Sequence, residues 1–279
     1  MFKDGLVVVI PTYNREEVLE RAISSVLSQS FSEFSLVIVD DGSTDKTKQL
    51  VGSLIEVDSR IHYLYQGNRG VSSARNLAIE KNSKSKWFAF LDSDDEWLPN
   101  KLEKQWELLT RDQSLVCHTE EIWIRNGKRV NQMKKHQKYG GWIFDHSLEM
   151  CKMSPSSIII HSDVFDSCGL FSEDYEVCED YDLWLKITSQ FPVSFCEEPL
   201  IKKYGGHEDQ LSRKFFAMDR WRVKSLDHLL SNYSLGLEQQ DKAKAVLLKK
   251  LEILIKGYKK RDNITMLADL NKYLEKYQG

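Results

Sequence analysis

The sequence predicts a mostly parallel α/β fold, because strand-like and helix-like segments alternate through its first 110 residues. The run LVVVI at 6–10 is β-branched, as a strand buried on both faces requires. Residues 15–30 carry apolar side chains at helical spacing, with Asn14 and Glu17 at capping positions of that helix. Further strands, separated by helices, are expected at 35–39, 61–65 and 86–91. Right-handed crossovers between such strands make the sheet parallel.

The second half of the chain alternates less regularly. Pro99 suits the first turn of a helix, and Asn126 followed by Gly127 predicts a tight hairpin. A strand and two helices are expected further on, at 156–160, 162–168 and 180–191. Beyond residue 215 the pattern is only helical, in two or three amphipathic segments.

Composition and charge exclude several classes of protein. The chain has 279 residues and a net charge of −3, so it carries no overall field that attracts nucleic acid. Its five cysteines are scattered, which indicates reduced thiols and not a disulfide framework or zinc site. The N-terminal apolar run ends after five residues, so we expect neither a signal peptide nor a membrane span. The expected location is the cytoplasm, with a peripheral contact at the inner face of the membrane left open.

Polar segments follow each of the four predicted strands of the first half. They read PTYN, DDGSTD, QGNRG and DSDDEW, at 11–14, 40–45, 66–70 and 92–97. Any one of them could be an ordinary turn between a strand and a helix. In open α/β sheets, however, ligands bind beyond the carboxyl ends of the strands. The four segments together therefore predict a ligand site at that edge.

The densest of these segments holds Asp92, Asp94 and Asp95. Carboxylates this close repel one another unless they are protonated, solvated or bound to a cation. A hard divalent ion such as Mg²⁺ or Mn²⁺ takes one or two carboxylates together with substrate phosphates. Capping of the helix near Pro99 is the alternative, but it needs only one of the three aspartates.

The segments VVVIPTYNREEVLERAISSVLSQSFSEFSLVIVDDGSTDKT, GVSSARNLAI and FLDSDDEWLPNKL resemble the nucleotide-sugar-binding half of family 2 glycosyltransferases, of the bacterial polysaccharide type. The resemblance runs from about residue 6 to 109 and continues more loosely to about 212. It implies the GT-A fold, with a catalytic domain at 1–214 and a helical extension at 215–279. Within that domain, 1–110 would be the nucleotide-sugar-binding half and 111–214 the acceptor half.

The resemblance assigns donor-binding roles residue by residue. Tyr13 matches the aromatic residue that stacks on the base, while Pro11 and Thr12 shape the backbone around it. Asp41 matches the residue that hydrogen-bonds the base, and Asp40 would support it or the ribose.

The acidic segment matches the DXD motif of the family. Asp94 would be the direct metal ligand, and Asp92 a ribose or metal-water contact with Ser93 between them. Asp95 would belong to the turn before Pro99. His207 of KYGGHEDQLSR matches a position that contacts the metal or the diphosphate, which suits Mn²⁺ at least as well as Mg²⁺.

Arg75 matches a basic position near the phosphates. Arg69 could take that part instead, and a surface or helix-capping ion pair is the alternative for either arginine.

Glu179 and Asp180 in VCEDYDLWLKI resemble the ED motif, whose aspartate is the general base. An inverting transferase needs one carboxylate to deprotonate the acceptor hydroxyl, and we assign this role to Asp180 in preference to Glu179. Favourable interaction with the helix dipole is the alternative for both residues. Asp182 is expected on the helix surface.

The function that follows is a metal-dependent, inverting transfer of sugar from a nucleotide diphosphate, expected to be UDP. The acceptor would be a saccharide or a lipid-linked hydroxyl in cell-surface polysaccharide or glycoconjugate synthesis. The alternatives are a sugar-phosphate nucleotidyltransferase, whose glycine-rich N-terminal loop this chain lacks, and a non-catalytic nucleotide-sugar-binding protein. The basic segment 241–261, with eight Lys or Arg against two acids, would pack on the catalytic domain, contact a membrane or form a dimer.

Overall fold

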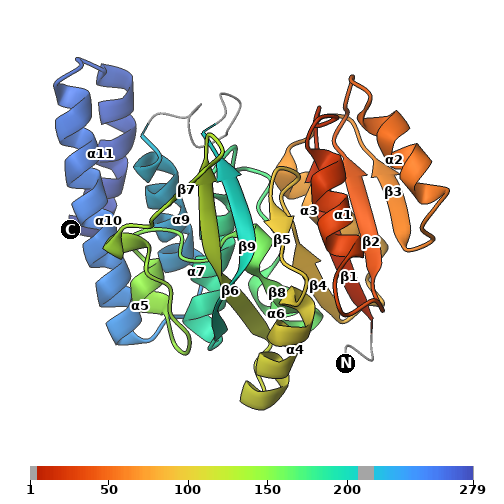
Figure 1. Ribbon diagram of the computed structural model, residues 1–279. Coiled ribbons are helices and arrows are strands. Elements are labelled where there is room, and N and C mark those ends of the chain that lie inside the picture. Colours follow the sequence, from red (N-terminus) through yellow and green to blue (C-terminus); the bar gives the residue numbers. More distant parts are fainter. Residues whose placement is uncertain (1–4, 207–216, 279) are drawn as a thin grey trace.

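The computed structural model describes residues 5–206 and 217–278 (Figure 1). Within these residues, nine strands form one sheet in the order β3-β2-β1-β4-β8-β6-β9-β5, with β7 paired to β6. The strands are β1 (Leu6–Thr12), β2 (Ser35–Asp40), β3 (Ile61–Tyr65), β4 (Trp87–Phe90), β5 (Glu96–Trp97), β6 (Val116–Arg125), β7 (Lys128–Val130), β8 (Ile159–His161) and β9 (Ser194–Gly205).

The first half of the sheet is parallel, as predicted. Strand β1 lies between β2 and β4, and β2 pairs with β3, all in parallel register. The connecting helices are α1 (Leu19–Leu27), α2 (Thr47–Ile55) and α3 (Val71–Lys81). Alternate residues of β1 face opposite sides, so Val8 packs in the cluster that contains α1 and Val9 in the cluster that contains α3. The sheet is therefore buried on both faces.

The predicted cap of the first helix is wrong. Helix α1 begins only at Leu19, and its N-cap position, Val18, makes no side-chain cap hydrogen bond. Asn14 instead has a left-handed backbone (φ 51°), which asparagine tolerates. Its side-chain oxygen accepts a hydrogen bond from the Thr44 amide at 2.8 Å, and its own amide donates to Ser43 at 2.8 Å. Asn14 therefore joins the loops that follow β1 and β2.

The second half of the sheet contains both parallel and antiparallel pairs. The predicted parallel arrangement therefore holds for the first half only. Strand β8 runs antiparallel to both β4 and β6, and β9 runs parallel to β6 but antiparallel to β5. Strand β9 was not predicted, because SFCEEPLIKKYG lacks regular alternation of polar and apolar residues. Its register against β6 shifts on either side of Glu120, which explains the broken pattern.

Most other elements of the second half agree with the prediction. The hairpin of β6 and β7 turns at Asn126 (φ 48°) and Gly127 (φ 72°), the positive values that a type I′ turn requires. The helices are α4 (Lys101–Asp112), α5 (Phe144–Ser147), α6 (Ser162–Cys168) and α7 (Glu179–Gln190), with 3₁₀ turns η1 (Lys134–His136) and η2 (Pro155–Ser157). Leu183 and Ile187 of α7 lie in the same core cluster as Ala74 of α3. Helices α3 and α7 therefore cover the same face of the sheet.

The last segment is helical, as predicted, and forms α9 (Asp219–Asn232), α10 (Leu237–Lys259) and α11 (Ile264–Gln278). Figure 1 shows α10 and α11 side by side at the end of the molecule opposite β3. Leu226 of α9 and Leu251 of α10 share a buried cluster with Tyr181 and Leu185 of α7. The extension thus packs directly on the helix that begins with Glu179, and its assignment as a unit apart from 1–214 stays a prediction. None of the described helices is both long and apolar enough to cross a membrane.

Candidate active site

The loops after β1 and β2 meet at the carboxyl edge of the sheet. The Asp41 amide donates to the carbonyl of Thr12 at 2.8 Å, which joins the two strand ends. The Asp41 carboxylate accepts hydrogen bonds at 2.8 Å from the Gln66 side chain and from the amides of Arg69 and Gly70. Asp41 therefore shapes the loop that leads into α3, and a contact with the base stays a prediction.

The other predicted nucleotide contacts lie at the same edge. Asp40 accepts hydrogen bonds from the hydroxyl of Tyr63 at 2.6 Å and from the amide of Ser43 at 2.8 Å. The Tyr13 side chain is 43% exposed, so an aromatic face is available for stacking. Pro11 and Thr12 are buried in β1, and the hydroxyl oxygen of Thr12 has no hydrogen-bond partner among the described residues.

The acidic segment after β4 is held by η2 and β9. Ser156 accepts a hydrogen bond from the Asp92 amide at 3.1 Å and donates its hydroxyl to Asp95 at 2.7 Å. The Tyr204 amide donates to the other oxygen of Asp95 at 3.0 Å. Asp95 does belong to a turn, because its amide donates to the Asp92 carbonyl. Its carboxylate is nevertheless buried, and burial together with Asp94 raises its pKa well above the ordinary value.

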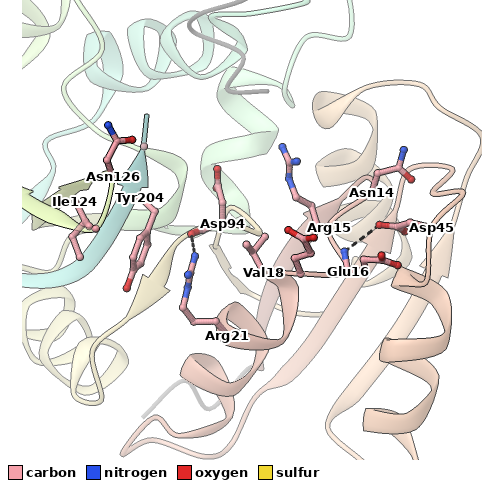
Figure 2. Close-up of a pocket in the computed structure, with 13 residues that line it drawn as sticks. Asn14, Arg15, Glu16, Val18, Arg21, Asp45, Asp94, Ile124, Asn126 and Tyr204 are labelled. Atoms are coloured by element: carbon pink, nitrogen blue, oxygen red, sulfur yellow. Dashed lines mark hydrogen bonds between the residues drawn. The ribbon is translucent and has the colours of Figure 1, made fainter. Parts of the chain in front are cut away.

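Helix capping does not explain the acidic segment. The N-cap position of α4 is Asn100, which makes no side-chain cap hydrogen bond. Ser93 is buried between Asp92 and Asp94. A cleft of about 530 Å³ opens next to this segment. Of the predicted site residues that the structure describes, only Asp94 lines it. Figure 2 shows Asn14 and Arg15 on one side of Asp94, with Asn126 and Tyr204 on the other.

Arg21 forms one wall of this cleft. Its guanidinium lies 3.8 Å from the centre of the Tyr204 ring and donates to the Asp94 carbonyl at 2.5 Å (Figure 2). The Asp94 main chain is therefore tied to α1 through Arg21.

Arg75 forms ion pairs with its side chain only 3% exposed, and not the surface or helix-capping pair that was the alternative. Its Nη2 donates to Asp92 at 2.8 Å and its Nη1 to Glu179 at 2.7 Å. Burial and the adjacent Asp180 raise the pKa of Glu179, although Arg75 opposes that rise. Arg69 is mostly exposed and pairs with Glu173 at 2.9 Å. A phosphate contact by either arginine stays a prediction.

Asp180 lies in the first turn of α7, next to Glu179. Its oxygens accept hydrogen bonds from the Tyr181 amide at 2.7 Å and the Cys151 thiol at 3.3 Å. Its side chain is only partly buried, so it has access to a ligand. The N-cap position, Cys178, makes no side-chain cap hydrogen bond, and the helix dipole favours both acids that follow it.

Asp182 is not a surface acid, which corrects the prediction. Its side chain is 1% exposed and pairs with Lys186 one turn further along α7 at 2.5 Å. Helix α9 covers this part of α7, with His228 3.6 Å from Asp182, and the local helical pattern does not reveal this packing.

Lys203 of β9 was missed by the sequence reasoning. Burial alone would lower its pKa, but Glu121, Asp95, Asp92 and Asp180 together raise it. Because its pKa is raised, Lys203 keeps its positive charge at neutral pH. No local pattern marks it, because β9 itself was not predicted.

The described residues suit a divalent ion that is held jointly with substrate. They contain no group of three or more His, Cys, Asp or Glu side chains arranged to hold a metal by themselves. Mg²⁺ and Mn²⁺ are often bound by one or two carboxylates plus substrate phosphates, and Asp94 offers one carboxylate at the cleft. His207 lies outside the described residues.

Comparisons with known proteins agree with this architecture. Residues 7–164 match the family model "Glycosyl transferase family 2". The chain is 34% identical over 202 residues to an uncharacterised glycosyltransferase of Rickettsia prowazekii, covering 70% of this chain and 62% of that protein. It is 31% identical over 188 residues to the Escherichia coli enzyme WfgD, a UDP-Glc:alpha-D-GlcNAc-diphosphoundecaprenol beta-1,3-glucosyltransferase, covering 67% and 71% of the two chains.

The solved structures add evidence for the fold. The structure of Staphylococcus aureus TarS 1–349 with UDP-GlcNAc superposes with a TM-score of 0.71 at 20% identity, covering 91% of this chain and 73% of that one. The fold is thus the GT-A fold that the sequence predicted. The chain spans 26% to 62% of the length of the first Rickettsia relatives it matches. On the family match and the identity to these relatives, the chain belongs to glycosyl transferase family 2.

Proposed function

We propose that this protein is a metal-dependent, inverting glycosyltransferase that moves a sugar from a UDP-sugar to an acceptor hydroxyl. The observation that carries the proposal is the convergence of two acidic motifs that lie far apart in the sequence. Arg75 contacts both Asp92 and Glu179, and Lys203 interacts electrostatically with both Asp92 and Asp180. The donor-side acid Asp92 and the first turn of α7, which carries the candidate base, are therefore joined by one arginine, which supports their action in a single displacement.

The residues take separate roles in this reaction. Tyr13 stacks on the base, and Asp41 and Asp40 hold the loops that bind the nucleoside. Asp94 would hold Mg²⁺ or Mn²⁺ together with the diphosphate, with Asp92 supporting it, and the bound ion would neutralise the charge of the leaving diphosphate.

Asp180 accepts the proton of the acceptor hydroxyl while that oxygen attacks the anomeric carbon. The bond to the diphosphate breaks on the opposite face, so the configuration inverts. Lys203 supplies a fixed positive charge beside the acids.

The donor and acceptor classes rest on what the relatives are named for. TarS was solved with UDP-GlcNAc, and WfgD is named for UDP-Glc and a diphosphoundecaprenol-linked acceptor. A UDP-sugar and a saccharide or lipid-linked acceptor in polysaccharide or glycoconjugate synthesis are the corresponding proposal here. A contact of the basic segment 241–261 with an anionic membrane surface belongs to the same proposal, and co-flotation with anionic but not neutral vesicles tests it.

A thermal-shift screen of nucleotide sugars, with and without Mn²⁺, tests the proposed function directly. Bound donor stabilises the folded state, so the true donor raises the unfolding temperature, and more so with metal. Asp94→Asn should abolish the metal-dependent part of this shift and the sugar transfer. Asp166→Asn, an exposed acid of α6, is the matched control and should behave as wild type. Full transfer by Asp94→Asn, or by wild type in excess EDTA, would contradict the metal role.

A further inference from the structure

We propose that Arg75 is a positioning residue that holds the donor-side acid Asp92 and the base-bearing helix α7 in one fixed arrangement. This inference rests on the function proposed above and assigns Arg75 a role through its neighbours in place of a phosphate contact.

The guanidinium geometry is the first support. Arg75 lies on α3, and its side chain is 3% exposed. One terminal nitrogen donates to Asp92 at 2.8 Å, and the other donates to Glu179 at 2.7 Å. Glu179 is 104 residues away in the sequence and directly precedes Asp180. The guanidinium of Arg75 therefore connects Asp92 with Glu179, the residue that directly precedes the proposed base.

The residue next to Arg75 makes a second connection to the same region. The Asn76 side chain donates to the Phe171 carbonyl at 2.8 Å and accepts from the Phe171 amide at 3.1 Å. The Phe171 ring lies 5.0 Å from the Arg75 guanidinium. Consecutive residues of α3 thus hold both the backbone before α7 and the first residue of α7.

Burial makes this arrangement dependent on arginine. Glu179 is buried, and without a cation it would be an uncompensated buried charge next to Asp180. The Asp92 amide is held separately by Ser156, so Arg75 controls chiefly the direction of the Asp92 carboxylate. Lysine supplies one point charge and cannot reach two carboxylates in the same fork geometry.

The test compares Arg75→Lys and Arg75→Met with wild type in UDP calorimetry and steady-state transfer. Misplacement by about 1 Å can cost roughly 100-fold in rate, so we expect kcat to fall about 10-fold in Arg75→Lys and about 100-fold in Arg75→Met. Donor KM and the Kd for UDP should rise by less than kcat falls, because the nucleoside contacts of Tyr13 and Asp41 remain. UDP calorimetry is repeated in EDTA, so that the effect of each variant on UDP binding is also measured without a bound metal ion.

Lys186→Met is the matched control, because Lys186 forms a comparably buried ion pair with Asp182 on the same helix. It should lower the unfolding temperature about as much as Arg75→Met while leaving kcat and KM within about twofold of wild type. Equal losses of kcat in Lys186→Met and Arg75→Met, or wild-type kcat in folded Arg75→Lys, would overturn the positioning role while the proposed function stands. A wild-type protein that transfers no sugar from any UDP-sugar would overturn the proposed function and this inference with it.

Discussion

Some charged side chains of this protein are buried at positions where the local sequence pattern predicts an exposed residue. Lys101, in the first turn of α4, is fully buried; its ammonium donates to Gln105 at 2.6 Å and lies 3.9 Å from the centre of the Trp97 ring. Burial lowers the pKa of Lys101 to about 7, and no carboxylate among residues 5–206 and 217–278 forms an ion pair with it. Lys101 thus differs from Arg75, whose charge two carboxylates compensate.

Lys101 should make the stability of the wild type depend on pH. Below pH 7 the folded and unfolded states both bind its proton, so it adds no pH dependence there. Above pH 7, up to the ordinary lysine pKa, only the unfolded state keeps the proton, so stability rises with pH. Between pH 7 and 9.5, wild type should gain about 2–3 kcal/mol relative to Lys101→Met in urea unfolding. An exposed control, Lys244→Met, should show no such difference, and the same result for Lys101→Met would contradict the lowered pKa.

Asp180→Asn should separate binding from chemistry. An amide cannot accept the hydroxyl proton, so we expect transfer to fall by about 10²–10⁴-fold while UDP-sugar binding stays within about twofold. Glu176→Gln, an exposed acid just before α7, is the control and should keep full transfer. Loss of donor binding together with transfer in Asp180→Asn, measured by calorimetry, would argue against a base role.

At the level of elements, the site depends on loops whose backbone allows few substitutions. Gly42 follows the Asp40–Asp41 pair with φ +85°, and a Cβ there would lie 2.9 Å from the Asn68 amide nitrogen. The loop that contains Asn68 is the one that Asp41 holds through the amides of Arg69 and Gly70. Gly127 has a similar φ of +72°, but a Cβ there would meet no atom within 4 Å.

These two glycines separate backbone strain from disruption of the site. Gly127→Ala should lose about 1–2 kcal/mol of unfolding free energy, since Gly127 adopts left-handed backbone. Gly42→Ala should lose more, because its Cβ would also clash with the Asn68 amide nitrogen. Only Gly42→Ala should also weaken UDP binding, by roughly tenfold or 1.4 kcal/mol, because it displaces the loop at Asn68. Equal UDP affinity of the two variants in calorimetry would show that this loop does not take part in donor binding.

At the scale of the whole molecule, the C-terminal helices and the catalytic region share one core. Leu247 and Leu251 of α10 are buried in the same cluster as Tyr181 and Leu185 of α7. Lys250 is also buried and donates to the Glu149 carbonyl at 2.8 Å and to Asp219 at 3.1 Å. The extension therefore supports the helix on which Asp180 lies.

A substitution in α10 should consequently destabilise the catalytic region as well. Leu251→Ala should lower the unfolding free energy by about 2–5 kcal/mol. Helix content, measured by circular dichroism, and UDP binding should be lost together in one transition, at a lower denaturant concentration than in wild type. Ile253→Ala on the same helix is the control, since Ile253 is 56% exposed and its truncation should cost little. Separate transitions for helix content and UDP binding would instead show that the extension unfolds as an independent unit.

The amino-acid sequence by itself determined the parallel first half, the turn at Asn126 and Gly127, and the positions of the acidic motifs. Strand and helix periodicity, turn chemistry and motif spacing are local properties, so they can be recognised without a structure.

Only the tertiary structure decided which of these acids meet and what compensates them. Arg75 joins Asp92 to Glu179, Lys203 lies among acids of both halves, and Asp182 is buried beneath the C-terminal helices. These contacts depend on β9, on α3 and α7 sharing one face of the sheet, and on the packing of α9 and α10. Such contacts join residues far apart in the chain, and their stability comes from burial and charge pairing that no local pattern encodes.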